Sequence, residues 1–107
     1  CIFSCFVDPE TVDNVVDCLL CQPFVGGFSM HGIEGYSKEH ANYTVSEQVA
    51  GHRSVCRIDI RLQHKDLDSL TAALAALSLQ HRIRYWVTPV IDSGIISKLK
   101  PVLRKLR

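Results

Sequence analysis

The sequence lacks the features that direct a protein into a membrane or onto a nucleic acid. Its 107 residues carry a net charge of only +1, so no excess of charge attracts a polyanion or an anionic lipid surface. The longest apolar stretch, Leu70 to Leu79, falls well short of the ~20 residues that a membrane-spanning helix needs. We expect no signal peptide, no membrane insertion and no nucleic-acid partner.

A disulfide framework is also missing. The chain has five cysteines, an odd number, and their spacing is unlike that of small secreted domains. Most of them fall within apolar patterns, which favours a reducing compartment, and we therefore expect a cytoplasmic protein. At 107 residues the chain is long enough for one domain with its own core, spanning 1–107.

The most informative stretch is a pair of strands joined by a very long connection. Residues 28–33 and 56–62 alternate between apolar and polar side chains, as half-buried strands do. The connecting loop, about 35–53, far exceeds the ~2–5 residues of a hairpin turn. A loop of this length in a small domain is usually functional or disordered.

The remaining elements complete a β-α-β-loop-β-α-β order. Residues 1–7 predict a strand that is apolar on both faces. Asp8-Pro9 predicts a helix start, with Asp8 as N-cap, and Asp66 is expected to cap a second helix. We predict the fold class α+β, a ferredoxin-like two-layer sandwich with both helices on one face of an antiparallel sheet. A short terminal helix is expected within an extension at about 92–107, with Pro101 near its start.

Two helices can cover only one face of this sheet. The other face is predicted to carry a mixture of apolar and polar side chains, namely Ile33, Val55 and Trp86 with Ser29, His31, Arg57, Asp59 and Arg61. Little of the chain is left to cover them, so the sequence predicts an oligomer in which another subunit does so. We expect the alternating charges at 57, 59 and 61 to form salt bridges between chains.

Several motifs give the chain a family resemblance. They are Gly26-Gly27-Phe28, His31, Glu34-Gly35-Tyr36, Ser46-Glu47-Gln48-Val49, Gly51 and Tyr85-Trp86-Val87-Thr88-Pro89. With these motifs and its strand order, the chain resembles the P-II superfamily, the trimeric nitrogen regulatory proteins and their relatives. It looks closest to a small P-II-like family of unassigned function, often encoded beside heavy-metal efflux systems.

The resemblance implies a homotrimer with ligand clefts between subunits, where an effector reorders the long loop and thereby controls a protein partner. The base of the long loop and the turn before the last strand would form the walls of each cleft. The candidate ligand residues in these segments are Gly35, Tyr36, Glu47, Gln48, His52, Arg53, Arg82 and Arg84. Residues 47, 48, 52 and 53 close the loop, where they are expected either to bind an anionic or polar effector or to form a solvated loop end. The partner we expect is a membrane transporter or efflux component.

One departure from the family pattern concerns ATP. In P-II proteins the turn before the last strand is rich in glycine and cradles phosphates, whereas residues 77–82 contain no glycine. Phosphate nests need backbone amides that a ligand can approach closely, which glycine permits. This turn therefore argues against nucleotide binding of the usual P-II kind.

Metal binding is the alternative function that the sequence leaves open. Cys18 and Cys21 are three residues apart on the first predicted helix and can share a soft ion such as Cu(I) or Zn(II), or simply pack or lie exposed. His31 can meet its symmetry mates in a trimer to form a three-imidazole site, or act as an interface histidine. The alternative protein would thus buffer or deliver copper-like ions.

Enzymatic chemistry is not expected. An acylphosphatase-like site on this fold needs an arginine in the loop after the first strand, but the loop at 7–10 is acidic. RNA recognition needs exposed aromatic side chains on the central strands, where the third strand instead has alternating charges. We therefore expect a non-enzymatic signalling or regulatory protein that senses a small-molecule or metal effector.

Overall fold

The computed structural model describes residues 1–36, 53–77 and 83–97. Four strands and two α-helices make up this part of the chain: β1 (Ile2–Val7), α1 (Val12–Leu20), β2 (Phe28–Gly35), β3 (Arg53–Arg61), α3 (Leu67–Ala75) and β4 (Arg84–Thr88). A 3-10 turn precedes each helix, η1 (Pro9–Thr11) before α1 and η2 (His64–Asp66) before α3. The predicted order of strands and helices is confirmed.

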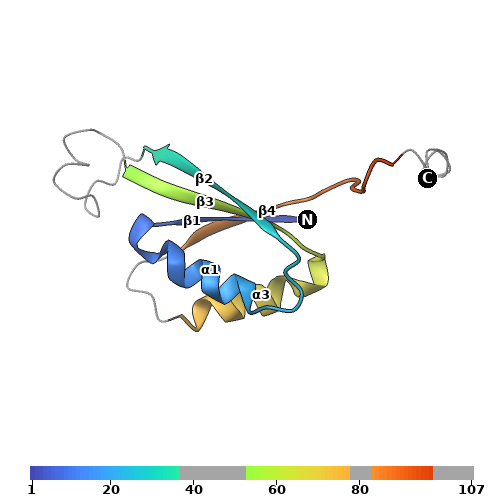
Figure 1. Cartoon of the computed structure of the whole chain (residues 1–107), viewed down its shortest axis with the longest axis horizontal. Helices are drawn as coiled ribbons and strands as arrows, with labels where there is room; N and C mark the ends of the chain where they lie inside the picture. The colour runs from blue at the N-terminus through green and yellow to red at the C-terminus, as the bar shows by residue number, and fades with distance from the viewer. Residues whose placement is uncertain (37–52, 78–82, 98–107) are drawn as a thin grey trace.

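The strands form one antiparallel sheet with the order β2-β3-β1-β4. Both helices lie on the same face, below the sheet in Figure 1, and leave the other face open. The predicted α+β class, with a four-stranded antiparallel sheet and two helices, is therefore confirmed. β1 and β3 occupy the centre, and β2 and β4 are the two edges.

The core lies between the sheet and the helices. β1 and β3 contribute the alternate residues that face the helices, and α1 and α3 contribute the apolar stripes predicted from their 3.6-residue period. The fully buried side chains include Phe3, Cys5, Val7, Val15, Leu19, Ile58, Ile60 and Leu70. Val12, Leu67 and Leu77 pack against this core while partly exposed.

The predicted helix caps are wrong in their detail. Asp8 and Asp66 both precede a helical turn, yet neither side chain accepts a capping hydrogen bond. At the first helix the chain makes a 3-10 turn instead, in which the backbone amide and hydroxyl of Thr11 both donate to the carbonyl oxygen of Asp8. The backbone carbonyl thus takes the place expected of the carboxylate.

After β4 the chain leaves the body of the molecule. Residues 89–97 have no regular secondary structure and run away from the sheet and the helices (Figure 1). The terminal helix expected around Pro101 lies outside the described residues. None of the helices described here has the length and apolar character needed to cross a membrane.

Candidate functional site

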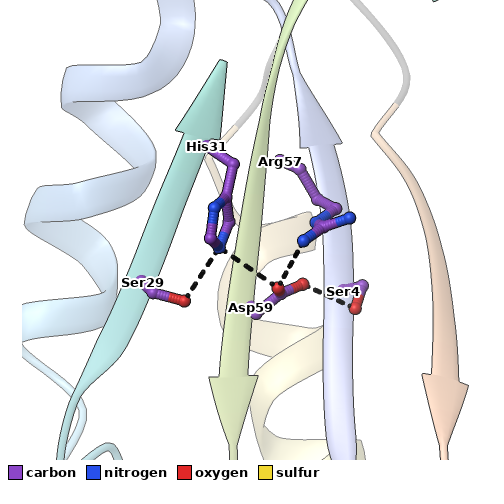
Figure 2. A network of polar contacts seen from close by, with 5 residues as sticks. All are labelled: Ser4, Ser29, His31, Arg57 and Asp59. Carbon is purple, nitrogen blue, oxygen red and sulfur yellow. Dashed lines mark hydrogen bonds and ion pairs between the residues drawn. The ribbon is translucent and has the colours of Figure 1, made fainter. Parts of the chain in front are cut away.

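The open face of the sheet carries a network of five polar side chains. Strand pairing places Ser4 and Ser29 on either side of Asp59, and places His31 opposite Arg57. Because directly paired residues point to the same face, and residues two apart on a strand do so as well, all five side chains meet away from the helices. Figure 2 shows Ser4, His31 and Arg57 meeting Asp59, while Ser29 contacts His31.

Asp59 is the common acceptor of this network. Its Oδ1 accepts a hydrogen bond from the Ser4 hydroxyl at 2.7 Å. Its Oδ2 lies 3.2 Å from Nη2 of Arg57 and 3.5 Å from Nε2 of His31. The ion pair joins residues two apart on one strand, so the pairing seen here lies within the chain. Whether these charges also bridge subunits stays a prediction.

The network does not have the geometry of a Ser–His–Asp catalytic triad. In such a triad the serine and the carboxylate contact different ring nitrogens, so that the histidine can relay a proton between them. Here Ser29 Oγ, at 3.2 Å, and Asp59 Oδ2 both approach Nε2 of His31. A proton on Nε2 satisfies the carboxylate, and the ring then has no basic nitrogen facing the serine. The contacts of Ser29 and Asp59 thus share one ring nitrogen of His31, which is not the triad arrangement.

A second feature is a shallow cavity where the long loop leaves the sheet. It has a volume of about 810 Å³. Its walls are the end of β2, the start of β3 and the first turn of the helical segment, through Pro9, Val12, Asp13, Gly32, Ile33, Glu34, Ser54, Val55 and Cys56. Among these residues two carboxylates, a hydroxyl and a thiol accompany the apolar groups.

Two of the described candidate ligand residues, Gly35 and Arg84, lie on opposite edge strands of the sheet. Gly35 ends β2 and pairs with Arg53 of β3, and the exposed Tyr36 donates a hydrogen bond at 3.4 Å to Glu34. Arg84 begins β4 and is exposed. Glu47, Gln48, His52 and Arg82 lie outside the described residues.

Gly35 and Arg84 are not brought together within one chain. Three strand-to-strand steps separate β2 from β4, which amounts to about 14 Å at ~4.8 Å for each step. The cleft between subunits that the family resemblance implies stays a prediction.

The candidate metal ligands do not form a cluster in this chain. Cys21 is exposed, whereas Cys18 is partly buried and its thiol donates to the carbonyl oxygen of Ala73 at 3.7 Å. Burial raises the pKa of the Cys18 thiol, against a smaller lowering by the Gln22 hydrogen bond. In the described ranges no three His, Cys, Asp or Glu side chains come close enough to hold a metal.

Sequence reasoning missed some of the residues that matter here. Ser4 was assigned only to a strand covered on both sides, although its hydroxyl binds Asp59. Asp13, Ser54 and Cys56 line the cavity without having been candidates for it. The register of β1 against β3, which pairs Ser4 with Asp59, is what reveals this contact. The alternation of apolar and polar residues gives that register only once the order of the strands in the sheet is known.

The chain is similar to known proteins in both sequence and structure. Residues 2–97 match a family model described as protein of unknown function, DUF3240. The chain is also similar to the crystal structure of a DUF3240 family protein from Shewanella baltica OS155 at 2.40 Å resolution, with a TM-score of 0.74 and 27% identity. That likeness covers 90% of this chain and 94% of the other. No curated protein matches the sequence.

Proposed function

The chain belongs to the DUF3240 family, and we propose that it is a non-enzymatic regulatory protein of the P-II-like kind. In this proposal three copies form a ferredoxin-like trimer in the cytoplasm. An effector binds at the base of the long loop, in clefts between subunits, and the loop engages or releases a protein partner such as a transporter or efflux component. The strand order β2-β3-β1-β4 supports the ferredoxin-like assignment.

The cavity at the root of the loop is the observation that carries this proposal. A ligand in it touches Gly32 to Glu34 on β2 and Ser54 to Cys56 on β3, the two strands from which the loop emerges. Such a ligand favours whichever strand-end geometry it fits best, and thereby shifts the population of loop conformations. Because the cavity adjoins the strand ends that hold the loop, binding can affect the loop directly, without a conformational change elsewhere in the molecule.

The lining also limits the kind of effector. Asp13 and Glu34 bring two carboxylates to the wall, and none of the described lining residues is a lysine, arginine or histidine. A carboxylate wall repels phosphate and attracts hydrogen-bond donors and positive charge. The effector we propose for this cavity is therefore a small molecule that presents donor groups, such as an amine, rather than a nucleotide held through its phosphates.

A thermal-shift panel on the purified protein tests this function. The panel contains nucleotides, amino acids, small amines, divalent ions and cuprous ion. We expect a compound with donor groups to raise the melting temperature, because a ligand that binds only the folded state stabilises it. The shift should disappear in Asp13→Asn with Glu34→Gln and persist in Asp17→Asn, an exposed carboxylate one helical turn along α1 that does not line the cavity.

Two results would contradict the proposal. If no compound in the panel changes the melting temperature, the protein binds none of the proposed effectors. A compound whose shift survives the double variant binds elsewhere, and the root of the loop then has no sensing role.

A further inference from the structure

Two cysteines at the end of α1 form a pair of thiols that the proposed function does not use. Cys18 lies in the last turn of the helix, and Cys21 is its C-cap residue. Both are free thiols, Cys21 exposed and Cys18 partly buried. A solvent-accessible cysteine next to a second one that can resolve its oxidised form is typical of sites of reversible oxidation.

The backbone at the end of α1 brings the two side chains to the same side of the helix. The amide of Cys21 donates to the carbonyl oxygen of Asp17 at 3.3 Å and to that of Cys18 at 3.2 Å. The second bond joins residues three apart, as in a 3-10 turn, where side chains at these positions lie above one another. Burial, and to a smaller extent the charge of neighbouring Cys21, raises the pKa of the Cys18 thiol. The two sulfur atoms are therefore close enough to interact.

A disulfide between these residues requires only a small adjustment of the last helical turn. Residues three apart on a helix have Cβ atoms about 5–6 Å apart, whereas a disulfide brings them to about 3.5–4.5 Å. Cys21 can move closer because it is exposed and because residues 22–27 form no helix or strand that would hold it. The buried Leu19 need not move. The resulting bond would be exposed and somewhat strained, and disulfides of that kind are the ones that are readily reduced.

The surroundings of the Cys18 sulfur prepare it to react with an oxidised Cys21. The side-chain amide of Gln22 donates to this sulfur at 3.8 Å, and a second bond to the carbonyl oxygen of Cys18 at 3.0 Å holds the amide in place. A donor at this position favours the thiolate, which is the form that attacks a disulfide. The thiol also donates to the carbonyl oxygen of Ala73 on α3 at 3.7 Å, so its hydrogen is part of the contact between the helices.

We propose that Cys18 and Cys21 form a reversible disulfide by exchange with a low-molecular-weight disulfide such as oxidised glutathione. The thiolate of Cys21 attacks the small disulfide, forms a mixed disulfide and releases one small thiol. The thiolate of Cys18 then attacks the Cys21 sulfur, and the second small thiol leaves. The protein loses two electrons and two protons, which end on the two released thiols. Oxidation also removes the hydrogen that Cys18 donates to Ala73, so the redox state alters the contact between α1 and α3.

The test incubates the folded full-length chain with oxidised glutathione at mildly alkaline pH. Remaining thiols are then blocked with iodoacetamide, and the disulfides are mapped by mass spectrometry. We expect the peptide that carries Cys18 and Cys21 to lose two hydrogens and to carry neither glutathione nor the blocking group. The far-UV circular dichroism spectrum should stay unchanged, because only the end of α1 adjusts. An excess of reduced glutathione should restore both thiols.

Four single variants separate the two steps of the exchange. Cys18→Ser should stop the reaction at the mixed disulfide, so that Cys21 keeps one glutathione. Cys21→Ser should react more slowly, because the remaining Cys18 is partly buried. Gln22→Leu should capture glutathione at the wild-type rate and then accumulate the mixed disulfide, since only the second step uses the amide. Cys56→Ser, which removes a half-buried thiol outside the pair, is the control and should form the internal disulfide as the wild type does.

Several outcomes would overturn the proposal. They are a wild type that does not react, one that keeps glutathione on Cys21 without closing the internal bond, a disulfide to another cysteine, or a bond that survives excess reduced glutathione. The proposed effector site is tested separately, because neither cysteine lines the cavity. A variant with Cys18→Ser and Cys21→Ser should give the same thermal shift with a donor-bearing effector as the wild type does. Failure of the sensing role therefore leaves the redox pair standing, and the reverse also holds.

Discussion

At the scale of single residues, Asp59 organises the polar part of the open face. Ser4, Arg57 and His31 all direct a hydrogen-bonding or charged atom at its carboxylate. Ser4 is 6% exposed, so its hydroxyl has little access to water as a replacement partner. The Nε atom of Arg57 is buried and has no hydrogen-bond partner. Loss of the carboxylate would leave two donors poorly satisfied.

We therefore predict that Asp59→Ala lowers the free energy of unfolding by about 1–3 kcal/mol, the usual cost of an unsatisfied buried donor. The ion pair itself adds little, because the Arg57 side chain is 38% exposed and water screens it. Urea unfolding at one protein concentration measures the change. Asp17→Ala, at an exposed carboxylate, is the control. Equal midpoints for the two variants would contradict the role given to Asp59.

Cys5 gives a prediction about pH. Burial, with smaller contributions from Cys56 and Asp59, raises the pKa of its thiol from 9.0 to about 12. Between these values the unfolded chain releases the proton while the folded chain keeps it, so stability falls as the pH rises through this window. We expect the fall between pH 9 and 10 to be shallower in Cys5→Ala than in the wild type. The exposed Cys21→Ala variant controls for the loss of a thiol. Identical slopes for wild type and Cys5→Ala would contradict the prediction.

The residue scale also shows where sequence reasoning succeeds and where it stops. Alternation correctly assigned His31, Arg57 and Asp59 to the open face and Cys5 to the core. It did not find the bond from Ser4 to Asp59, because a contact between strands 55 positions apart depends on their register. A helix-cap preference at Asp8 was overridden by a 3-10 turn.

At the scale of elements, the apolar stripes of the two helices hold them against the sheet. Leu70 of α3 is fully buried with Leu19 of α1 and Ile58 of β3 in one cluster. The sequence predicts these stripes well because the 3.6-residue and two-residue periods are local properties. Element ends are predicted less well: alternation indicates strands at 28–33 and 56–62, whereas β2 continues to Gly35 and β3 already begins at Arg53.

Leu70→Ala tests the packing of these elements. Removing a fully buried leucine leaves a cavity as well as a loss of apolar burial, so we expect a loss of about 2–5 kcal/mol in unfolding free energy. Leu20→Ala removes the same atoms from a largely exposed position and should change stability by less than about 0.5 kcal/mol. Denaturant unfolding measures both. Similar losses in the two variants would mean that α3 is not packed as described.

At the scale of the whole molecule, three features point in the same direction. One sheet face is uncovered, residues 89–97 run away from the sheet, and the candidate ligand residues Gly35 and Arg84 lie on opposite edges of the sheet. In an isolated chain each feature leaves surface uncovered or candidate ligand residues far apart, and each is expected in a subunit of an oligomer. The sequence predicted the uncovered face, since two helices cannot cover both sides. It predicted an extension at about 92–107, but no periodic pattern singled out Ile91, Ile95 and Ile96, which are exposed.

The mass of the wild-type protein in solution, measured by light scattering at micromolar concentration, tests the central claim most directly. The claim is that this chain acts as a subunit whose open sheet face is covered by another copy. It predicts a mass three times that of the 12.0 kDa chain. A mass of one chain would contradict it, because neither the cleft between subunits nor the covered sheet face could then exist.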